Sequence, residues 1–243
     1  MDEPVFERVL VAVGPGRQSQ VVLAAAARIA ARLGSDLIGL FVEDESWLRL
    51  AELPGATVIT TASGRRALDT TTLERALRRA RAEAENVLEH AAASLGIHTT
   101  FRVLRGVTDR SIAASLERGD LLVLEHSELG HALQSAVAGS EASILCLDPA
   151  DADSRSIAVA FDPSEAGSAR LAAATRLAAA AECELTVLPR LLLLHGAARP
   201  ADLAAREPRT ILALSSADFS SVQSGSEQAA IVRLRRRSLL VLR

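Results

Sequence analysis

A segment near the start of this 243-residue chain recurs, without a gap, 148 residues later. Residues 8–40 and 156–188 carry the same amino acid at twelve equivalent positions, including the Val-Ala pair of the first apolar run and a shared Pro and Arg. Each copy begins with a short Val-rich run and continues through a turn into an Ala-rich stretch, which is the order strand, turn, helix. The chain is therefore expected to contain two related lobes in tandem, at residues 1–149 and 155–243.

Short apolar runs alternate with helical stretches in both lobes, which predicts parallel sheets with right-handed crossovers. We expect strands at 8–13, 36–42, 99–104, 120–124 and 143–147 in lobe 1, and at 156–161, 184–188, 190–194, 210–214 and 238–242 in lobe 2. The predicted fold class is α/β, with two tandem doubly wound five-stranded parallel-sheet lobes and helices on both faces. The second lobe is truncated, since only Pro189 is expected between its second and third strands.

The longest predicted helix lies at 71–95, where Thr71 and Glu74 have the spacing of a capping box and Gly96 is a typical helix terminator. Between the second strand and this helix, residues 43–69 show no periodicity and contain an acidic run and the chain's one Trp. We expect this segment to be irregular, and the most mobile or partner-dependent part of lobe 1. Trp47 either packs on its own lobe or contacts a partner.

Composition excludes several function classes. All 27 basic residues are Arg, so neither a Schiff-base lysine nor a phosphate-loop lysine exists. The formal net charge of −3 does not favour a nucleic-acid partner. The five histidines show no metal-ligand spacing and no nucleophile motif occurs, so we expect no catalytic residue and no metal site.

The N-terminal sequence and the lengths of the apolar runs indicate where in the cell the protein is expected. The chain begins with the acidic, polar sequence MDEPVFER, which is unlike a secretory signal. Charges interrupt every apolar run before the roughly 20 residues that a membrane span requires. We therefore expect a cytoplasmic protein without membrane insertion.

Three features of the sequence resemble the universal stress protein family in its tandem-domain form. They are the first-strand units VLVAVGPG and IAVAFDPSEAGS, the strand FRVLRG, and the C-terminal segment GSEQAAIVRLRRRSLLVL. The resemblance implies that nucleotide-binding members have an Asp after the first strand and a glycine signature ending in Gly-Ser after the fourth. Lobe 2 keeps Asp162, with Pro163 and Ser164 in the turn, and Gly225 with Ser226 before its last strand. These five residues are the candidates for binding ATP or AMP.

Both lobes depart from that signature. Lobe 2 lacks the two earlier glycines, and lobe 1 has Gly14 in place of the Asp and Glu125 where phosphates would lie. We therefore expect no cofactor in lobe 1 and at most ATP or AMP in lobe 2. The open alternative is that Asp162 only caps the following helix and that Gly225-Ser226 only starts another.

The resemblance implies a non-enzymatic stress-response or regulatory protein with degenerate nucleotide sites, acting through contacts with an unidentified protein partner. The alternative is an adenine-nucleotide-binding sensor that uses lobe 2. Family members pair through their fifth strands, which here implies that 143–147 pairs with 238–242 within one chain, as a pseudo-dimer, and leaves a homodimer open.

Overall fold

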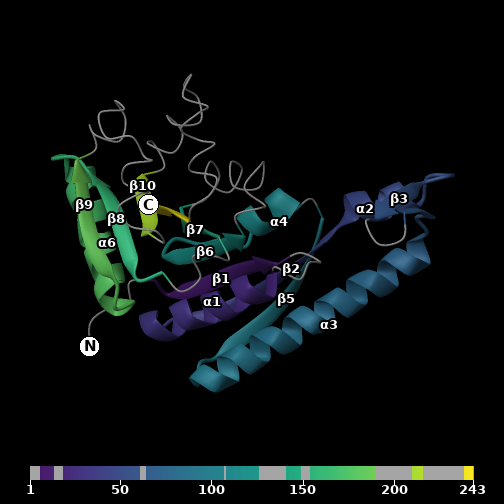
Figure 1. The fold of residues 1–243 in the computed structure, drawn as a ribbon, viewed down its shortest axis with the longest axis horizontal. Helices are drawn as coiled ribbons and strands as arrows, with labels where there is room; N and C mark the ends of the chain where they lie inside the picture. The colour runs from purple at the N-terminus through teal and green to yellow at the C-terminus, as the bar shows by residue number, and fades with distance from the viewer. Residues whose placement is uncertain are drawn as a thin grey trace.

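The computed structural model describes residues 6–13, 19–60, 64–106, 108–125, 141–148, 154–189, 210–215 and 238–242. Within these ranges, nine strands form one continuous sheet in the order β5-β2-β1-β6-β7-β11-β10-β8-β9 (Figure 1). Its strands are β1 (Arg8–Val13), β2 (Asp36–Asp44), β5 (Thr99–Gly106), β6 (Asp120–Glu125), β7 (Ser143–Leu147), β8 (Ser156–Phe161), β9 (Glu184–Pro189), β10 (Thr210–Ser215) and β11 (Leu239–Leu242). The predicted α/β class is confirmed.

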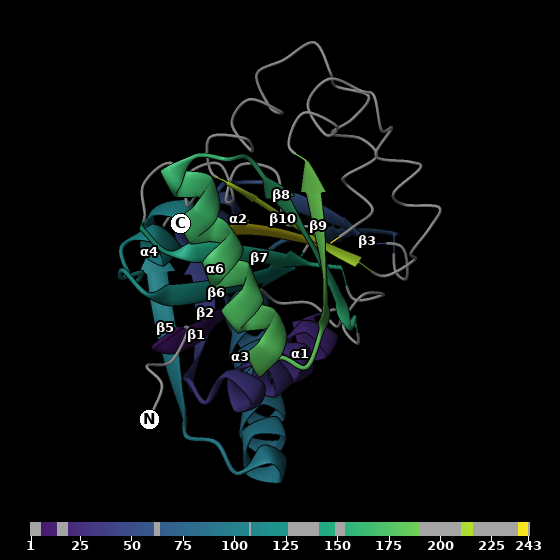
Figure 2. The same cartoon turned by 90° about the vertical axis from the view of Figure 1, so that its left-hand side faces the viewer.

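Helices cover both faces of this sheet. They are α1 (Ser19–Leu33), α2 (Glu45–Ala51), α3 (Thr70–Leu95), α4 (Thr108–Ala113) and α6 (Glu165–Ala180). One of them, α2, lies beyond the end of the sheet (Figure 1). One core cluster joins α1, α3 and α6 to a single face, on which α1 and α6 are neighbours (Figure 2). Ile112 of α4 belongs to the core of the other face. The face with α1 and α6 is thus continuous from one lobe to the other.

The two lobes meet where β7 pairs antiparallel with β11, with Leu145 opposite Leu240. The neighbouring strands within each lobe pair in parallel. Both seam strands are buried along their length, so pairing satisfies backbone groups that water could not reach. As a result, the strands of lobe 1 and lobe 2 run in opposite directions.

The expectation of an irregular stretch at 43–69 is wrong. This segment contains α2 and an antiparallel hairpin of β3 (Thr57–Thr60) and β4 (Gly64–Ala67). Asp44 caps α2 by accepting a hydrogen bond from the Ser46 amide at 2.8 Å. Trp47 keeps 55% of its surface exposed, so the alternative of a packed Trp47 is not observed.

The predicted long helix is present, but its proposed cap is wrong. α3 begins at Thr70, because the Asp69 carboxylate accepts a hydrogen bond from the Thr72 amide at 2.8 Å. Its end is confirmed, since Gly96 adopts a φ of 67° as the C-cap. Together with α2 and the hairpin, the first half of α3 projects beyond the end of the sheet (Figure 1).

In lobe 2, Pro189 belongs to β9 instead of separating two strands, and the predicted strand at 190–194 lies outside the described residues. Whether a helix follows β9 is therefore not tested. No helix in the described part of the chain is both long enough and apolar enough to span a membrane.

Candidate functional site

Ligands of open α/β sheets bind beyond the carboxyl ends of the strands, at the point where the strand order reverses. In lobe 1 this point lies between β1 and β6, and in lobe 2 it lies between β8 and β10. Because the lobes pair antiparallel through β7 and β11, the strands of lobe 1 and those of lobe 2 have their carboxyl ends at opposite edges of the sheet. The chain therefore offers two separate candidate sites.

Asp162, the predicted site residue of lobe 2, follows β8 directly at such a point. Its side chain is 19% exposed and forms an ion pair with Arg170 of α6, in which Nη2 donates to Oδ2 at 2.6 Å. Its other oxygen accepts hydrogen bonds from the amide of Ser164, at 3.1 Å, and from the hydroxyl of the same residue. Both oxygens of the candidate ligand-binding carboxylate are thus engaged by the protein itself.

Ser164 performs the capping that was one of the two predicted roles of Asp162. Its hydroxyl accepts a hydrogen bond from the Gly167 amide at 2.9 Å and starts α6. The prediction that Asp162 caps the helix is therefore wrong, because Asp162 instead holds the capping residue in position. Pro163 is exposed in the same turn.

Gly167 is the point of closest approach between α6 and this turn. A Cβ at position 167 would lie 2.0 Å from the backbone oxygen of Asp162 and 2.8 Å from its Oδ1. Only a residue without a side chain fits there. The glycine thus allows the Asp162 turn to lie directly against the first turn of the helix.

Arg170 was missed by the sequence analysis. Its side chain is only 13% exposed, and its Nε is buried without a hydrogen-bond partner. The available signal was an Arg two turns into the helix that follows a strand-terminal Asp, a spacing that returns its side chain toward that carboxylate. Gly225 and Ser226, the remaining predicted site residues, lie outside the described residues.

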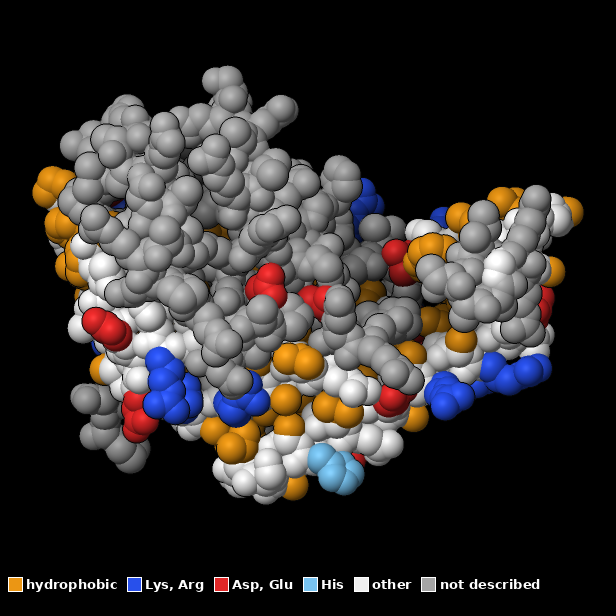
Figure 3. All heavy atoms as spheres, in the orientation of Figure 1, with side chains coloured by type: hydrophobic (Ala, Val, Ile, Leu, Met, Phe, Trp, Pro, Cys, Tyr) orange, Lys and Arg blue, Asp and Glu red, His pale blue; other side chains and the backbone are white. Residues whose placement is uncertain are grey.

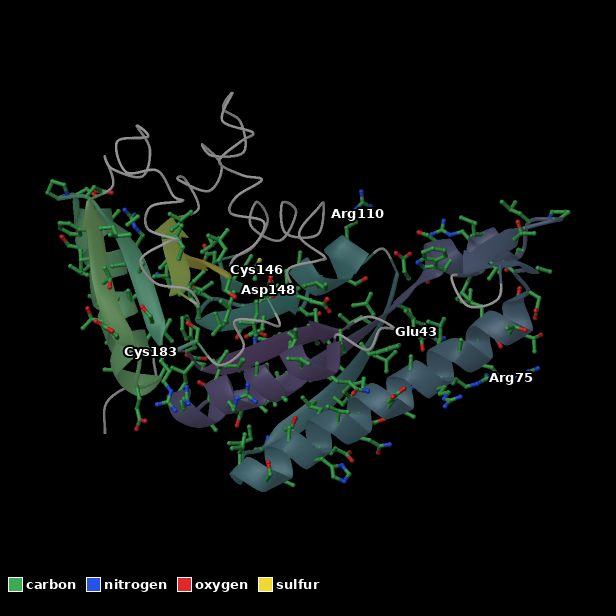
Figure 4. The ribbon with its side chains drawn as sticks, in the orientation of Figure 1. Glu43, Arg75, Arg110, Cys146, Asp148 and Cys183 are labelled. Atoms are coloured by element: carbon green, nitrogen blue, oxygen red, sulfur yellow. The ribbon has the colours of Figure 1, made fainter. Side chains whose placement is uncertain are left out.

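The carboxyl edge of lobe 1 is acidic. Glu43 is the penultimate residue of β2 and Glu125 the last residue of β6, on either side of β1, and both are buried. Arg105 of β5 donates from Nε to Glu43 at 2.9 Å, where β2 extends past β1 but is still paired with β5 (Figure 4). Gly14, which replaces the family's Asp, lies outside the described residues. Two buried carboxylates near this switch point disfavour a phosphate ligand.

A second Arg–Asp pair stabilises lobe 1 at its amino edge. Arg8 donates from Nε and Nη2 to Asp120 at 2.8 and 2.7 Å, and the Asp120 side chain is 1% exposed. The hydrogen bonds to Asp120 raise the pKa of Arg8 above its usual value. This bidentate pair joins the first residues of β1 and β6, far from the carboxyl edge, so its role is structural.

Thiol and metal chemistry have little support in the described part of the chain. Burial raises the pKa of both cysteine thiols, Cys146 within β7 and Cys183 before β9 (Figure 4). Neither is therefore an activated nucleophile. The described residues include no group of three His, Cys, Asp or Glu side chains that could hold a metal ion.

Solved structures provide the comparison for this geometry. A universal stress protein from Archaeoglobus fulgidus superposes with a TM-score of 0.61 over 98% of both chains, at 13% sequence identity. A universal stress protein in complex with cAMP matches 59% of this chain and 98% of its own (TM-score 0.36, 16% identity). A universal stress protein family member from Burkholderia pseudomallei matches 77% of this chain and 99% of its own (TM-score 0.32, 19% identity).

No protein-family model matches the sequence, and neither does any curated protein. The first of the structural matches extends over nearly the whole of both chains, so it includes both lobes. The chain has the fold of a universal stress protein.

Proposed function

We propose that this chain is a stress-response regulator of the universal stress protein family that acts through protein contacts and without catalysis. The observation that supports it is the engagement of Asp162 by Arg170 and Ser164. A nucleotide that approached this carboxylate would have to displace a charge-assisted hydrogen bond inside a largely buried pair. In this proposal the two lobes form a pseudo-dimer that serves as a rigid platform for a protein partner.

The acidic edge of lobe 1 supports the same proposal. Phosphate binding there would bring negative charge toward Glu43 and Glu125, which are 8% and 6% exposed. At short range and in a partly buried setting, that repulsion is much stronger than in water. Neither lobe is then a nucleotide sensor.

A second candidate function, an adenine-nucleotide-binding sensor that uses lobe 2, has one specific observation in its favour. The buried Nε of Arg170 has no hydrogen-bond partner, so the guanidinium retains a donor that an anion could accept from. In that function Asp162 and Arg170 would both contact ligand, with Gly225 and Ser226 nearby in the manner that the resemblance implies.

Calorimetric titration of the intact protein with ATP, AMP and cAMP separates the two functions. If the chain is a regulator that binds no nucleotide, the unmodified chain gives no binding heat with any of the three. The sensor predicts binding that Asp162→Ala, Arg170→Ala and Gly225→Val each abolish, whereas Asp36→Ala, at an exposed carboxylate on the amino edge of lobe 1, leaves it unchanged. Tight binding that survives all of these substitutions would reject both readings of lobe 2.

A further inference from the structure

The outer face of α3 is open along the length of the helix. The opposite face packs on α1 and the sheet through Leu77, Ala84, Leu88 and Ala92. Seven residues of the outer face are exposed: Arg75, Arg78, Arg79, Ala82, Asn86, Glu89 and Ala93. In Figure 1, α3 forms the outermost layer on its side of the molecule. A straight partner could therefore approach this face without meeting any other described part of the chain.

Charges along α3 are sorted by sign. Residues 70–82 contain four Arg and one Glu, a net charge of +3, whereas residues 83–95 contain three Glu and no Arg, a net charge of −3 with His90 neutral. Figure 3 shows the basic side chains gathered at the projecting end of the helix, and Figure 4 shows Arg75 on its outer side. One helix thus carries a basic half and an acidic half.

This order opposes the stability of the helix itself. The helix dipole favours acidic residues in the first turn and basic residues in the last, and α3 has neither. Intrahelical pairs favour Glu four residues before a basic residue, and Glu74 and Arg78 form one such pair at 3.8 Å. Arg79 and Arg81, however, precede Glu83 and Glu85 in the opposite order. Stabilisation of an isolated, solvated helix therefore accounts for only a small part of the pattern.

The pattern is self-complementary about Ala82. Arg75 lies seven residues before this alanine and Glu89 seven after it, while Arg78 and Asn86 lie four residues on either side, and all four are exposed. In an antiparallel pair of α3 helices centred on Ala82, Arg75 of one copy therefore faces Glu89 of the other, and Arg78 faces Asn86. Ala82 meets its own equivalent, where a small side chain permits close approach, as a two-fold interface requires.

From this charge order we infer that α3 binds α3 of a second copy of this chain, antiparallel, with Ala82 on the two-fold axis. Nucleic acid does not fit the surface, because the acidic half would repel the same backbone that the basic half attracts. The outer face of α3 includes neither of the sheet edges at which the strands of the two lobes end. The inference therefore holds or fails independently of the proposed function.

Sedimentation equilibrium of the full chain is the first test. We expect the average mass to rise with concentration from the 25.6 kDa of one chain toward twice that value, and to fall again in 1 M salt, where charges are screened beyond about 3 Å. A single-chain mass at every concentration would overturn the inference. So would a dimer that salt does not weaken.

Charge reversal tests the register. The variants Arg75→Glu and Glu89→Arg should each weaken self-association about tenfold, since each places like charges opposite one another at both symmetric contacts. An equimolar mixture of the two should restore it as a heterodimer, because both of these contacts are again between opposite charges. The matched control Arg102→Glu, at an exposed position outside α3, should dimerise with less than a twofold change. Loss of association in the control, or no restoration in the mixture, would overturn the proposed contact.

A symmetric cross-link tests the axis without altering charge. Ala82→Cys should form a disulfide-linked dimer under mild oxidation, because the two introduced thiols face each other. Ala76→Cys, exposed on the same helix but away from the axis, should not cross-link. The unmodified chain, with Cys146 buried and Cys183 partly buried, is the background. Equal cross-linking at positions 76 and 82, or none at 82, would contradict an antiparallel contact centred there.

Discussion

Each lobe contains an Arg–Asp ion pair beside its first strand, and the two pairs lie at opposite ends of those strands. In lobe 1, Arg8 and Asp120 join β1 to β6 at the amino edge. In lobe 2, Asp162 and Arg170 join the end of β8 to α6 at the carboxyl edge. The two copies of the repeated segment thus share a strand-turn-helix plan, whereas their Arg–Asp pairs lie at different places.

The location decides what each pair can do. A pair at the amino edge lies away from any ligand that the fold could bind, so it contributes only stability. A pair at the carboxyl edge contributes stability too, but it also occupies the position from which a ligand would be bound. The difference teaches that the same kind of ion pair has a different consequence at each end of a strand, because only the carboxyl edge is a place where this fold binds ligands.

The largest expected effect is in lobe 1. Asp120→Ala should lower the free energy of unfolding by about 3–5 kcal/mol, because it leaves the Arg8 guanidinium and the Glu117 amide without their buried acceptor. Urea denaturation measures the change. Glu117→Ala, which removes the 73%-exposed second partner of Arg8, is the control and should cost less than about 1 kcal/mol. Equal losses of unfolding free energy in the two variants would contradict the view that the burial of Asp120 makes this ion pair strong.

Gly167→Ala should come next, at about 3 kcal/mol, since the added methyl group meets backbone that cannot move aside independently. The comparison in lobe 1 is Gly39→Ala, where a Cβ would lie 2.6 Å from the Leu88 side chain and 2.9 Å from that of Phe101. Those side chains can shift, so about 1 kcal/mol is expected there. Thermal unfolding of both variants checks the order, and a larger loss for Gly39→Ala would contradict it.

Asp162→Ala should cost about 1–3 kcal/mol, less than Asp120→Ala. Asp162 is 19% exposed against 1% for Asp120, so water can replace part of what the Arg170 guanidinium loses. The double variant Asp162→Ala/Arg170→Met should recover part of this loss, because no buried charge then remains unpaired. Urea denaturation of the single and double variants gives the comparison. No recovery in the double variant would mean that Asp162 acts through Ser164 alone.

The smallest effect is expected for Arg105→Ala at the carboxyl edge of lobe 1. Its side chain is 74% exposed, so the pair with Glu43 should contribute less than about 1 kcal/mol. The loss should shrink further in 1 M salt. A salt-independent loss above 2 kcal/mol would instead indicate that Arg105 neutralises the buried Glu43 as strongly as Arg170 neutralises Asp162.

The sequence by itself determined the repeated strand-turn-helix unit, the α/β class and the end of α3 at Gly96. These features depend on local periodicity and on backbone preferences of single residues, which neighbours along the chain are enough to specify. The same local reasoning failed at 43–69, where Asp44 starts a two-turn helix too short to produce a periodic signal. It also placed the cap of α3 two residues late, because Asp69 competed with Thr71 for the same amides.

The tertiary structure alone decided which charges meet. Arg8 and Asp120 are 112 residues apart and become neighbours only because β6 pairs beside β1 in one register. Asp162 could be named as a site residue from its place after a strand, but its engagement depends on the angle at which α6 leaves the turn, which the close approach at Gly167 permits. Contacts between distant segments depend on strand order and helix packing, and no pattern along the chain encodes either one directly.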